Sequence, residues 1–275
     1  AERKLVIDEA HQFERAVVSA YTAVFSLKVT RNVLSRLADE RSSRGLLTRL
    51  AKDIKDSDAT DELIALDVLT KSLFQRSRLS FQEAAGFPSQ SQTTEETRQR
   101  LKPQSADQEL IESTLSPLLD EFEELGDRLD KLNQVLAREE ELPRDVKERV
   151  LELRTISAAL ADLIESGKLT IGCSEANFVY WVEASQRRTN PTLALYAAPI
   201  SVAVPLAKAL WSNTNGVVLT SATLAHHGDY SVLANALGIR STEKTEVIKV
   251  VLDSPFALPR QMRLLCPAYL PDAKQ

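Results

Sequence analysis

Two short apolar runs, far apart in the chain, each end directly in polar residues. Residues 5–7 (Leu-Val-Ile) precede Asp8-Glu9-Ala10-His11, and residues 217–220 (Val-Val-Leu-Thr) precede Ser221-Ala222-Thr223. Unbroken β-branched runs of this kind are typical of strands buried in a parallel sheet. We predict that the two runs are neighbouring strands, or lie one strand apart, with Asp8 and Ser221 at the same edge.

Apolar residues between these runs recur at spacings of three and four, the period of an amphipathic helix. The pattern predicts helices over residues 13–39, 46–54, 63–85, 115–136 and 146–163, the last two forming an antiparallel hairpin. Residues 88–105 have almost no apolar content, and we expect a mobile loop there. Because no other run between residues 13 and 166 has strand period, we expect this part to be almost wholly helical.

Strand patterns return after residue 170. Residues 178–183 and 193–197 have the pattern of strands, and residues 203–210 and 230–237 that of helices. We expect these strands to join the two terminal runs in one sheet, from which the intervening helices loop out. The predicted fold class is α/β, a partial parallel sheet with a large all-α insertion.

Composition narrows the class of protein. The 275 residues are 43% apolar and 27% charged, as in soluble globular proteins, and only 8 are glycine, which favours a helix-rich fold over a β-sandwich. Cys173 and Cys266 are too few for a four-thiolate cluster or zinc site, and a disulfide framework is not expected. With no membrane-length apolar run and no signal-peptide pattern, we expect a cytoplasmic protein.

The net charge of the whole chain does not favour binding to nucleic acid. The formal net charge is −5, and residues 106–166 hold seventeen acidic and seven basic residues, a net −10 that would repel a phosphate backbone. DNA contacts would need a local patch. Candidates are Trp181 and Tyr180, as stacking platforms or simply core aromatics, and Arg187 and Arg188 as phosphate ligands. His226-His227 fits a solvated turn better than a metal site.

The acidic pair at the end of the first run carries the clearest chemistry. Ligands of open α/β sheets bind at the carboxyl ends of strands, where phosphoryl transfer needs one carboxylate for Mg²⁺ and a second group to orient water. Asp8 and Glu9 are residues of the right type in the right place. The plainer interpretation, acidic residues at a helix N-terminus, is disfavoured by the apolar run in front of them.

The two motifs resemble motifs II and III of superfamily 2 helicases. Together with the helical insertion, the segments at residues 179–183 (Val-Tyr-Trp-Val-Glu), 198–200 (Ala-Pro-Ile) and 254–256 (Ser-Pro-Phe) resemble the XPD/DinG family, in particular its bacterial DinG/YoaA-like branch. The resemblance covers the middle of the chain only by architecture, since the arch domain of that family is a helical insertion at this point.

The resemblance implies an ATP-driven 5′-to-3′ DNA helicase with two RecA-like motor domains of the P-loop NTPase fold, acting in repair or replication. It implies that Asp8 holds Mg²⁺, usually through water, that Glu9 polarises the attacking water, and that His11 senses the nucleotide. Ser221-Ala222-Thr223 would couple the ATP site to the DNA-binding face. The implied cofactors are ATP and Mg²⁺, the partner is DNA without a membrane, and a monomer is expected.

The chain also departs from the family pattern. It has no Gly-x-Gly-Lys-Thr phosphate loop, and the cysteines for the family's iron–sulfur cluster would lie outside it. We expect residues 1–12 and 170–250 to be parts of motor domain 1, residues 13–169 the arch, and residues 251–275 the start of motor domain 2. Such a piece should not hydrolyse ATP alone.

Two alternatives from other classes stay open. The chain could come from a different P-loop nucleic-acid translocase or remodelling ATPase, which would share the Asp-Glu-Ala-His and Ser-Ala-Thr motifs. It could also be a non-enzymatic helical interaction module in which both motifs are coincidental.

Overall fold

The computed structural model describes residues 4–85, 97–139, 142–185, 192–225, 228–239, 246–252, 256–263 and 265. The chain divides into two compact units. The terminal unit comprises Ala1–His11 and Ala203–Gln275, and the helical unit comprises Gln12–Val202. Each is built around its own sheet.

The terminal unit pairs the two strands that precede the motifs at Asp8 and Ser221. Strands β1 (Lys4–Ile7) and β6 (Gly216–Leu219) pair in parallel, with Lys4 opposite Gly216 and Ile7 opposite Leu219. The predicted adjacency of the two runs is therefore confirmed. The expected burial is not, because Val6 is 69% and Val218 56% exposed.

Short helices complete the described part of this unit. Two are 3-10 turns, η1 (Ala10–Gln12) and η2 (Trp211–Asn213), and three are α-helices, α7 (Ala203–Ala209), α8 (Ser231–Leu237) and α9 (Leu258–Gln261). The last residue of η1 belongs to the helical unit. Helix α7 packs against α8. Trp211 Nε1 donates to Leu237 O over 2.7 Å. Gly238 ends α8 in the left-handed region, and a Cβ there would lie 2.3 Å from Ala203 O, so the position requires glycine.

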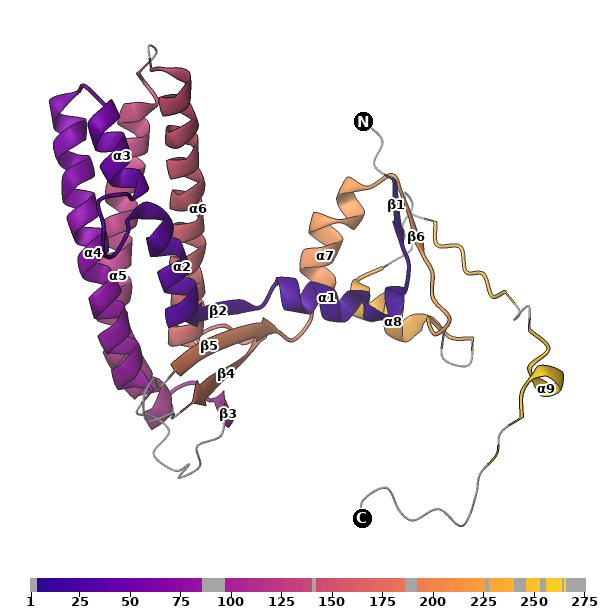
Figure 1. The fold of residues 1–275 in the computed structure, drawn as a ribbon. Coiled ribbons are helices and arrows are strands. Elements are labelled where there is room, and N and C mark those ends of the chain that lie inside the picture. Colours follow the sequence, from indigo (N-terminus) through magenta and orange to yellow (C-terminus); the bar gives the residue numbers. More distant parts are fainter. Residues whose placement is uncertain are drawn as a thin grey trace. The chain divides into compact units, whose positions relative to one another are not determined.

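The helical unit is dominated by three long helices that lie side by side, α4 (Ser57–Ala84), α5 (Ala106–Leu136) and α6 (Arg144–Gly172) (Figure 1). Their predicted apolar stripes are buried: Leu115, Phe122, Leu129 and Leu136 of α5 are at most 2% exposed. Helices α1 (Phe13–Ala20), α2 (Leu27–Leu37) and α3 (Leu46–Asp53) precede them. The periodicity therefore located α3 to α6 and the α5–α6 hairpin correctly.

A four-stranded antiparallel sheet, in the order β2-β5-β4-β3, completes the described part of the helical unit. Its strands are β2 (Ala23–Ser26), β3 (Thr97–Leu101), β4 (Phe178–Ser185) and β5 (Thr192–Pro199). One face packs on the helices, where the rings of Phe25 and Phe81 lie 5.2 Å apart. The other face is partly open to solvent. It presents the cross-strand row Val24, Tyr196, Trp181 and Arg100.

This sheet corrects several expectations. Residues 13–39 are not one helix, because β2 interrupts them, and Ser26, extended at φ −154°, begins α2 by accepting the N–H of Val29. Residues 97–101, expected in a loop, form β3. The prediction of an almost wholly helical region over residues 13–166 was therefore wrong. The rest of the expected loop up to residue 96 lies outside the described residues.

The expectation of a single sheet was also wrong. Strands β4 and β5 pair with β2 and β3 and not with β1 or β6. The reason is that strand partners are chosen by tertiary contacts, which the period of a strand does not report. Residues 170–202 consequently lie in the helical unit, while the expected assignment of residues 13–169 to an arch and of residues 170–250 to motor domain 1 stays a prediction.

Candidate active site at the carboxyl end of β1

Backbone hydrogen bonds continue past the ends of β1 and β6, into the Asp8-Glu9-Ala10-His11 motif and up to the start of the Ser221-Ala222-Thr223 motif. Thr220 N–H donates to Ile7 O over 3.0 Å, and Ala10 N–H donates to Thr220 O over 3.0 Å. Ala10 is fully buried. The motif that begins at Asp8 is therefore held against the start of the Ser221-Ala222-Thr223 segment, although about 210 residues separate them.

Glu9 adopts a left-handed conformation with φ +49°, uncommon for a residue with a side chain. The Asp8 carboxylate accepts the Glu9 N–H over 2.9 Å and so supports this turn directly after the strand. A left-handed residue other than glycine costs roughly 1–2 kcal/mol. Strain of this kind tends to persist where it positions a functional group, which here is the Glu9 carboxylate.

Three side chains converge at this turn. His11 Nδ1 lies 2.8 Å from Ser221 Oγ and 3.1 Å from Glu9 Oε2. Ser221 Oγ donates to Glu9 Oε2 over 3.2 Å, and the Thr223 N–H donates to Ser221 Oγ over 3.4 Å. A tautomer with its proton on Nδ1 makes the histidine a donor in this group. Ser221 thus links the two motifs through its hydroxyl.

The group is accessible to a substrate. The side chains of His11 and Glu9 are 38% and 62% exposed. One oxygen of Glu9 is engaged by Ser221 and His11, so the second can accept a proton from water. Ala222, between the two hydroxyl residues, is exposed and offers only its backbone for binding.

The donor set around Asp8 fits Mg²⁺ shared with a bound phosphate. Among the residues described by the structure, no three His, Cys, Asp or Glu side chains gather closely enough to hold a metal by themselves. Mg²⁺ usually keeps several waters and is held by one or two carboxylates together with substrate phosphates. Asp8, with one oxygen used by Glu9 N–H, can supply one such ligand.

The candidate DNA residues lie elsewhere in the chain. Tyr180 is 3% exposed, and its hydroxyl is tied to the backbone of Glu175, so it is a core residue. Trp181 is half-buried and stacks on Tyr196, with ring centroids 4.9 Å apart. Arg187, Arg188, His226 and His227 lie outside the described residues.

Cys173 is buried at the end of α6, and burial, followed by the nearby Glu112 carboxylate, raises its pKa to about 11. At neutral pH the thiol is protonated, whereas a metal ligand must be a thiolate. Cys266 lies outside the described residues.

Sequence reasoning missed Tyr196 and Arg98. Arg98 is centred 4.5 Å from the ring of Trp181. The alternation of β4 and β5 puts one aromatic on the solvent side of each strand. Only the register, Trp181 opposite Tyr196, brings the rings together.

Fold and site together define an α/β protein with a helix-rich insertion and an acidic pair at the carboxyl end of a parallel strand. No protein-family model matches the chain. Over an alignment of 275 positions that covers 95% of the chain, it is 24% identical to the 3'-5' exonuclease DinG of Bacillus subtilis (strain 168). It is 28% identical over 166 residues, 59% of its length, to the ATP-dependent DNA helicase YoaA of Haemophilus influenzae.

These matches support a DinG-like helicase family for the chain. The chain spans only about a quarter of each relative, 28% of the first and 23% of the second. Separately, none of the helices in the described ranges is both long and apolar enough to span a membrane.

Proposed function

We propose that the chain is the central part of an ATP-dependent 5′-to-3′ DNA helicase of the DinG/XPD type, acting in DNA repair or replication. The observation that carries the proposal is the contact among His11, Ser221 and Glu9, which joins the ends of two adjacent parallel strands. The name of the Haemophilus influenzae relative, an ATP-dependent DNA helicase, supports the same activity.

In this proposal Asp8 holds Mg²⁺ through water, and Glu9 orients and deprotonates the attacking water. Bound Mg²⁺ and ATP would supply the phosphoryl group and neutralise its charge. His11 reports the nucleotide state through Ser221, and Thr223 passes it toward the DNA-binding face. The 3.2 Å contact between Ser221 and Glu9 provides a physical path for this coupling.

The two units suit two parts of such a motor. We assign the terminal unit up to residue 250 to motor domain 1, residues 251–275 to the start of motor domain 2, and the helical unit to the arch. Because the chain has no Gly-Lys-Thr or Gly-Lys-Ser phosphate loop, it should not turn over ATP alone. A cytoplasmic monomer, with any iron–sulfur cluster held outside this chain, completes the proposal.

The test uses the intact protein that carries this chain. Glu9→Gln keeps the shape of the side chain but removes the charge that polarises water, so the loss falls in the transition state. We expect ATP turnover to fall by at least about 100-fold, the scale of general-base catalysis, with ATP and single-stranded DNA binding nearly unchanged. Glu14→Gln, on an exposed acid of α1, is the matched control.

Steady-state ATPase and unwinding of a 5′-tailed duplex separate the alternatives. ATP turnover that depends on Glu9 without strand separation would indicate a translocase or remodelling ATPase. An intact protein without ATP turnover would indicate an interaction module. Wild-type unwinding by Glu9→Gln would refute the assignment of this motif, and with it the helicase proposal.

A further inference from the structure

The helical unit contains an open cleft of about 780 Å³ between α2 and the β2 side of its sheet. Polar and charged groups of α2 form one wall, and Tyr196 of β5 and the buried Phe74 of α4 contribute aromatic surface. The side chains used below are Val24, Lys28, Arg31, Asn32, Asp39 and Glu40, all of which line it. Every lining residue belongs to the helical unit.

The Tyr196 ring is held in a fixed orientation. Trp181 stacks on one of its faces, with the rings 3° from parallel. Glu183 accepts the indole N–H of Trp181 over 3.1 Å, and burial, followed by this nearby carboxylate, raises the pKa of the Tyr196 hydroxyl. The Arg98 guanidinium lies over Trp181 and 3.7 Å from Glu183. Such a supported ring loses little freedom when a ligand stacks on it.

The second face of this ring belongs to the cleft. In the strand order, β4 with Trp181 lies on one side of β5, and β2 with Val24 lies on the other. Val24 and Tyr196 line the cleft, whereas Trp181 does not. A planar ligand in the cleft can therefore stack on Tyr196 from the side opposite Trp181.

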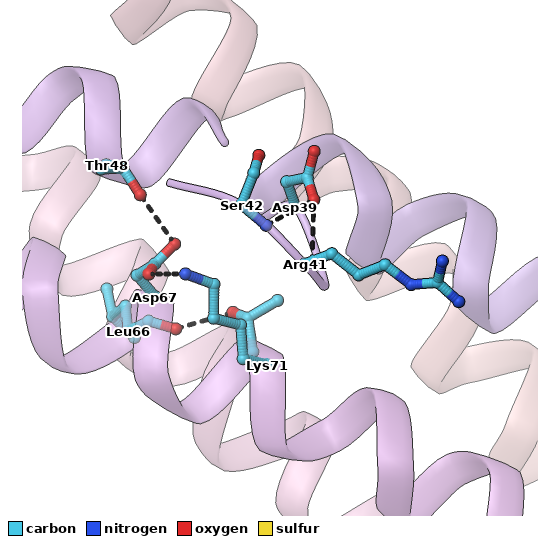
Figure 2. Close-up of polar contacts among 8 residues, drawn as sticks. Asp39, Arg41, Ser42, Thr48, Leu66, Asp67 and Lys71 are labelled. Carbon is cyan, nitrogen blue, oxygen red and sulfur yellow. Dashed lines mark hydrogen bonds and ion pairs between the residues drawn. The ribbon is translucent and has the colours of Figure 1, made fainter. Parts of the chain in front are cut away.

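The formal charges of the cleft residues named above, Lys28 and Arg31 against Asp39 and Glu40, sum to zero. Each nearby carboxylate has partners of its own: Asp39 accepts the N–H groups of Arg41 and Ser42, each over 2.9 Å (Figure 2). Those hydrogen bonds lower the pKa of Asp39. Glu40 pairs with Arg31 over 2.9 Å, and Glu183 is engaged as described.

Two cations remain available beside the ring. Within the described ranges, neither Lys28, which lines the cleft, nor Arg100, which lies opposite Trp181 on β3, forms an ion pair. Lys28 lines the cleft on the side of Tyr196 away from Trp181, and Arg100 lies beyond Trp181 on β3, so a nucleic-acid strand that crosses the ring could contact both.

We propose that this cleft and the adjoining row of the sheet bind an unpaired nucleic-acid strand. One base stacks on Tyr196, the flanking phosphates contact Lys28 and Arg100, and the Asn32 amide reaches the base edge. A duplex is excluded as the ligand of the ring, because its base faces are covered by their neighbours. The inference rests on the proposed DNA helicase function and places a strand-binding site on the helical unit.

The first test measures the Kd of the intact protein for a fluorescent oligothymidine of about 12 nucleotides, within the range bound by known single-strand sites. Loss of one base stack in Tyr196→Leu should raise Kd about tenfold. Tyr196→Phe, which keeps the ring, should stay within about threefold of wild type. Tyr21→Leu is the control, on a tyrosine of the same unit that is 43% exposed.

The salt dependence of binding tests the phosphate contact separately. Lys28→Ala should lower the slope of log Kd against log salt concentration by about 0.7, the value for one phosphate of a single strand. Lys52→Ala, on an exposed lysine of α3, should leave the slope unchanged. A role of Lys28 in folding alone would not change the slope.

Photocrosslinking gives a result that needs no variant. An oligonucleotide carrying 5-iodouracil should crosslink to Tyr196 of the wild-type protein, mapped by mass spectrometry. Crosslinks confined to other residues, an unchanged Kd in folded Tyr196→Leu, or equally strong competition by an acidic peptide would each overturn the inference. If Glu9→Gln still abolishes ATP turnover, the proposed function survives that failure. An intact protein that neither binds the strand nor hydrolyses ATP would refute both.

Discussion

Two glycines in the α5–α6 hairpin should respond in opposite ways to the same substitution. Gly126 lies within α5 and Gly167 within α6. In a helix interior, replacing Gly by Ala contributes up to about 1 kcal/mol of stability, because the unfolded chain loses freedom and the helix gains a better former. What differs between the two positions is the space for the new methyl group.

At Gly126 a Cβ would meet Ile164 Cδ1 at 3.4 Å, an ordinary van der Waals contact. At Gly167 it would lie 2.7 Å from Leu119 Cδ1 and 3.3 Å from the ring of the fully buried Phe25. Overpacking of a core costs about 1–3 kcal/mol, which exceeds the gain. We expect Gly126→Ala to stabilise the helical unit by about 0.5–1 kcal/mol and Gly167→Ala to destabilise it by about 1 kcal/mol.

Urea denaturation followed by far-UV circular dichroism measures both free energies of unfolding, since helices dominate that signal. The helical and terminal units can unfold separately, so the comparison uses the transition that carries most of the helical signal. Equal stabilisation by both substitutions would refute the reasoning, because it would mean that α6 does not approach Leu119 and Phe25 as closely as the structure has it.

The remaining predictions concern the site and one ion pair. In the intact protein, Asp8→Asn should weaken binding of Mg·ATP itself, whereas Thr223→Ala should retain part of the ATPase activity but lose unwinding. Fluorescent nucleotide binding and a helicase assay distinguish the two variants. Equal defects in both assays would contradict the separate roles of the two residues. The hydrogen bonds from Arg128 lower the pKa of Glu62 in the folded protein, so the pair stabilises above the unfolded pKa of about 4.3, and this stabilisation is lost as pH falls through the folded value. Because the side chains of Arg128 and Glu62 are 29% and 35% exposed, the pair should contribute at most about 1 kcal/mol. Urea titrations across this pH range should show that Arg128→Ala removes the pH dependence of stability. Arg144→Ala, at a side chain that is 93% exposed, should leave that dependence unchanged.

Local pattern was sufficient for the long helices and for the terminal strand pair. The apolar stripes at residues 115–136 and 146–163 each repeat over about five or six helical turns, so their apolar faces were evident before any packing was known. The runs before Asp8 and Ser221 are short, yet both are β-branched and end in polar motifs. Their parallel pairing therefore followed from the chemistry expected at one sheet edge.

The second sheet was decided by tertiary structure. Residues 23–26 lie within a helical apolar period, and residues 97–101 (Thr-Arg-Gln-Arg-Leu) have one large apolar side chain, so neither carries a strong strand signal. They become strands because β5 and β4 offer open edges with which their backbones can pair. The cleft beside Tyr196 depends on that pairing, because only the register across β2, β5 and β4 sets the ring between Val24 and Trp181. Register is a relation between distant segments, whereas hydrophobic period is a property of one segment. That is the physical reason why the sequence alone located the long helices and the terminal strand pair but not the aromatic site.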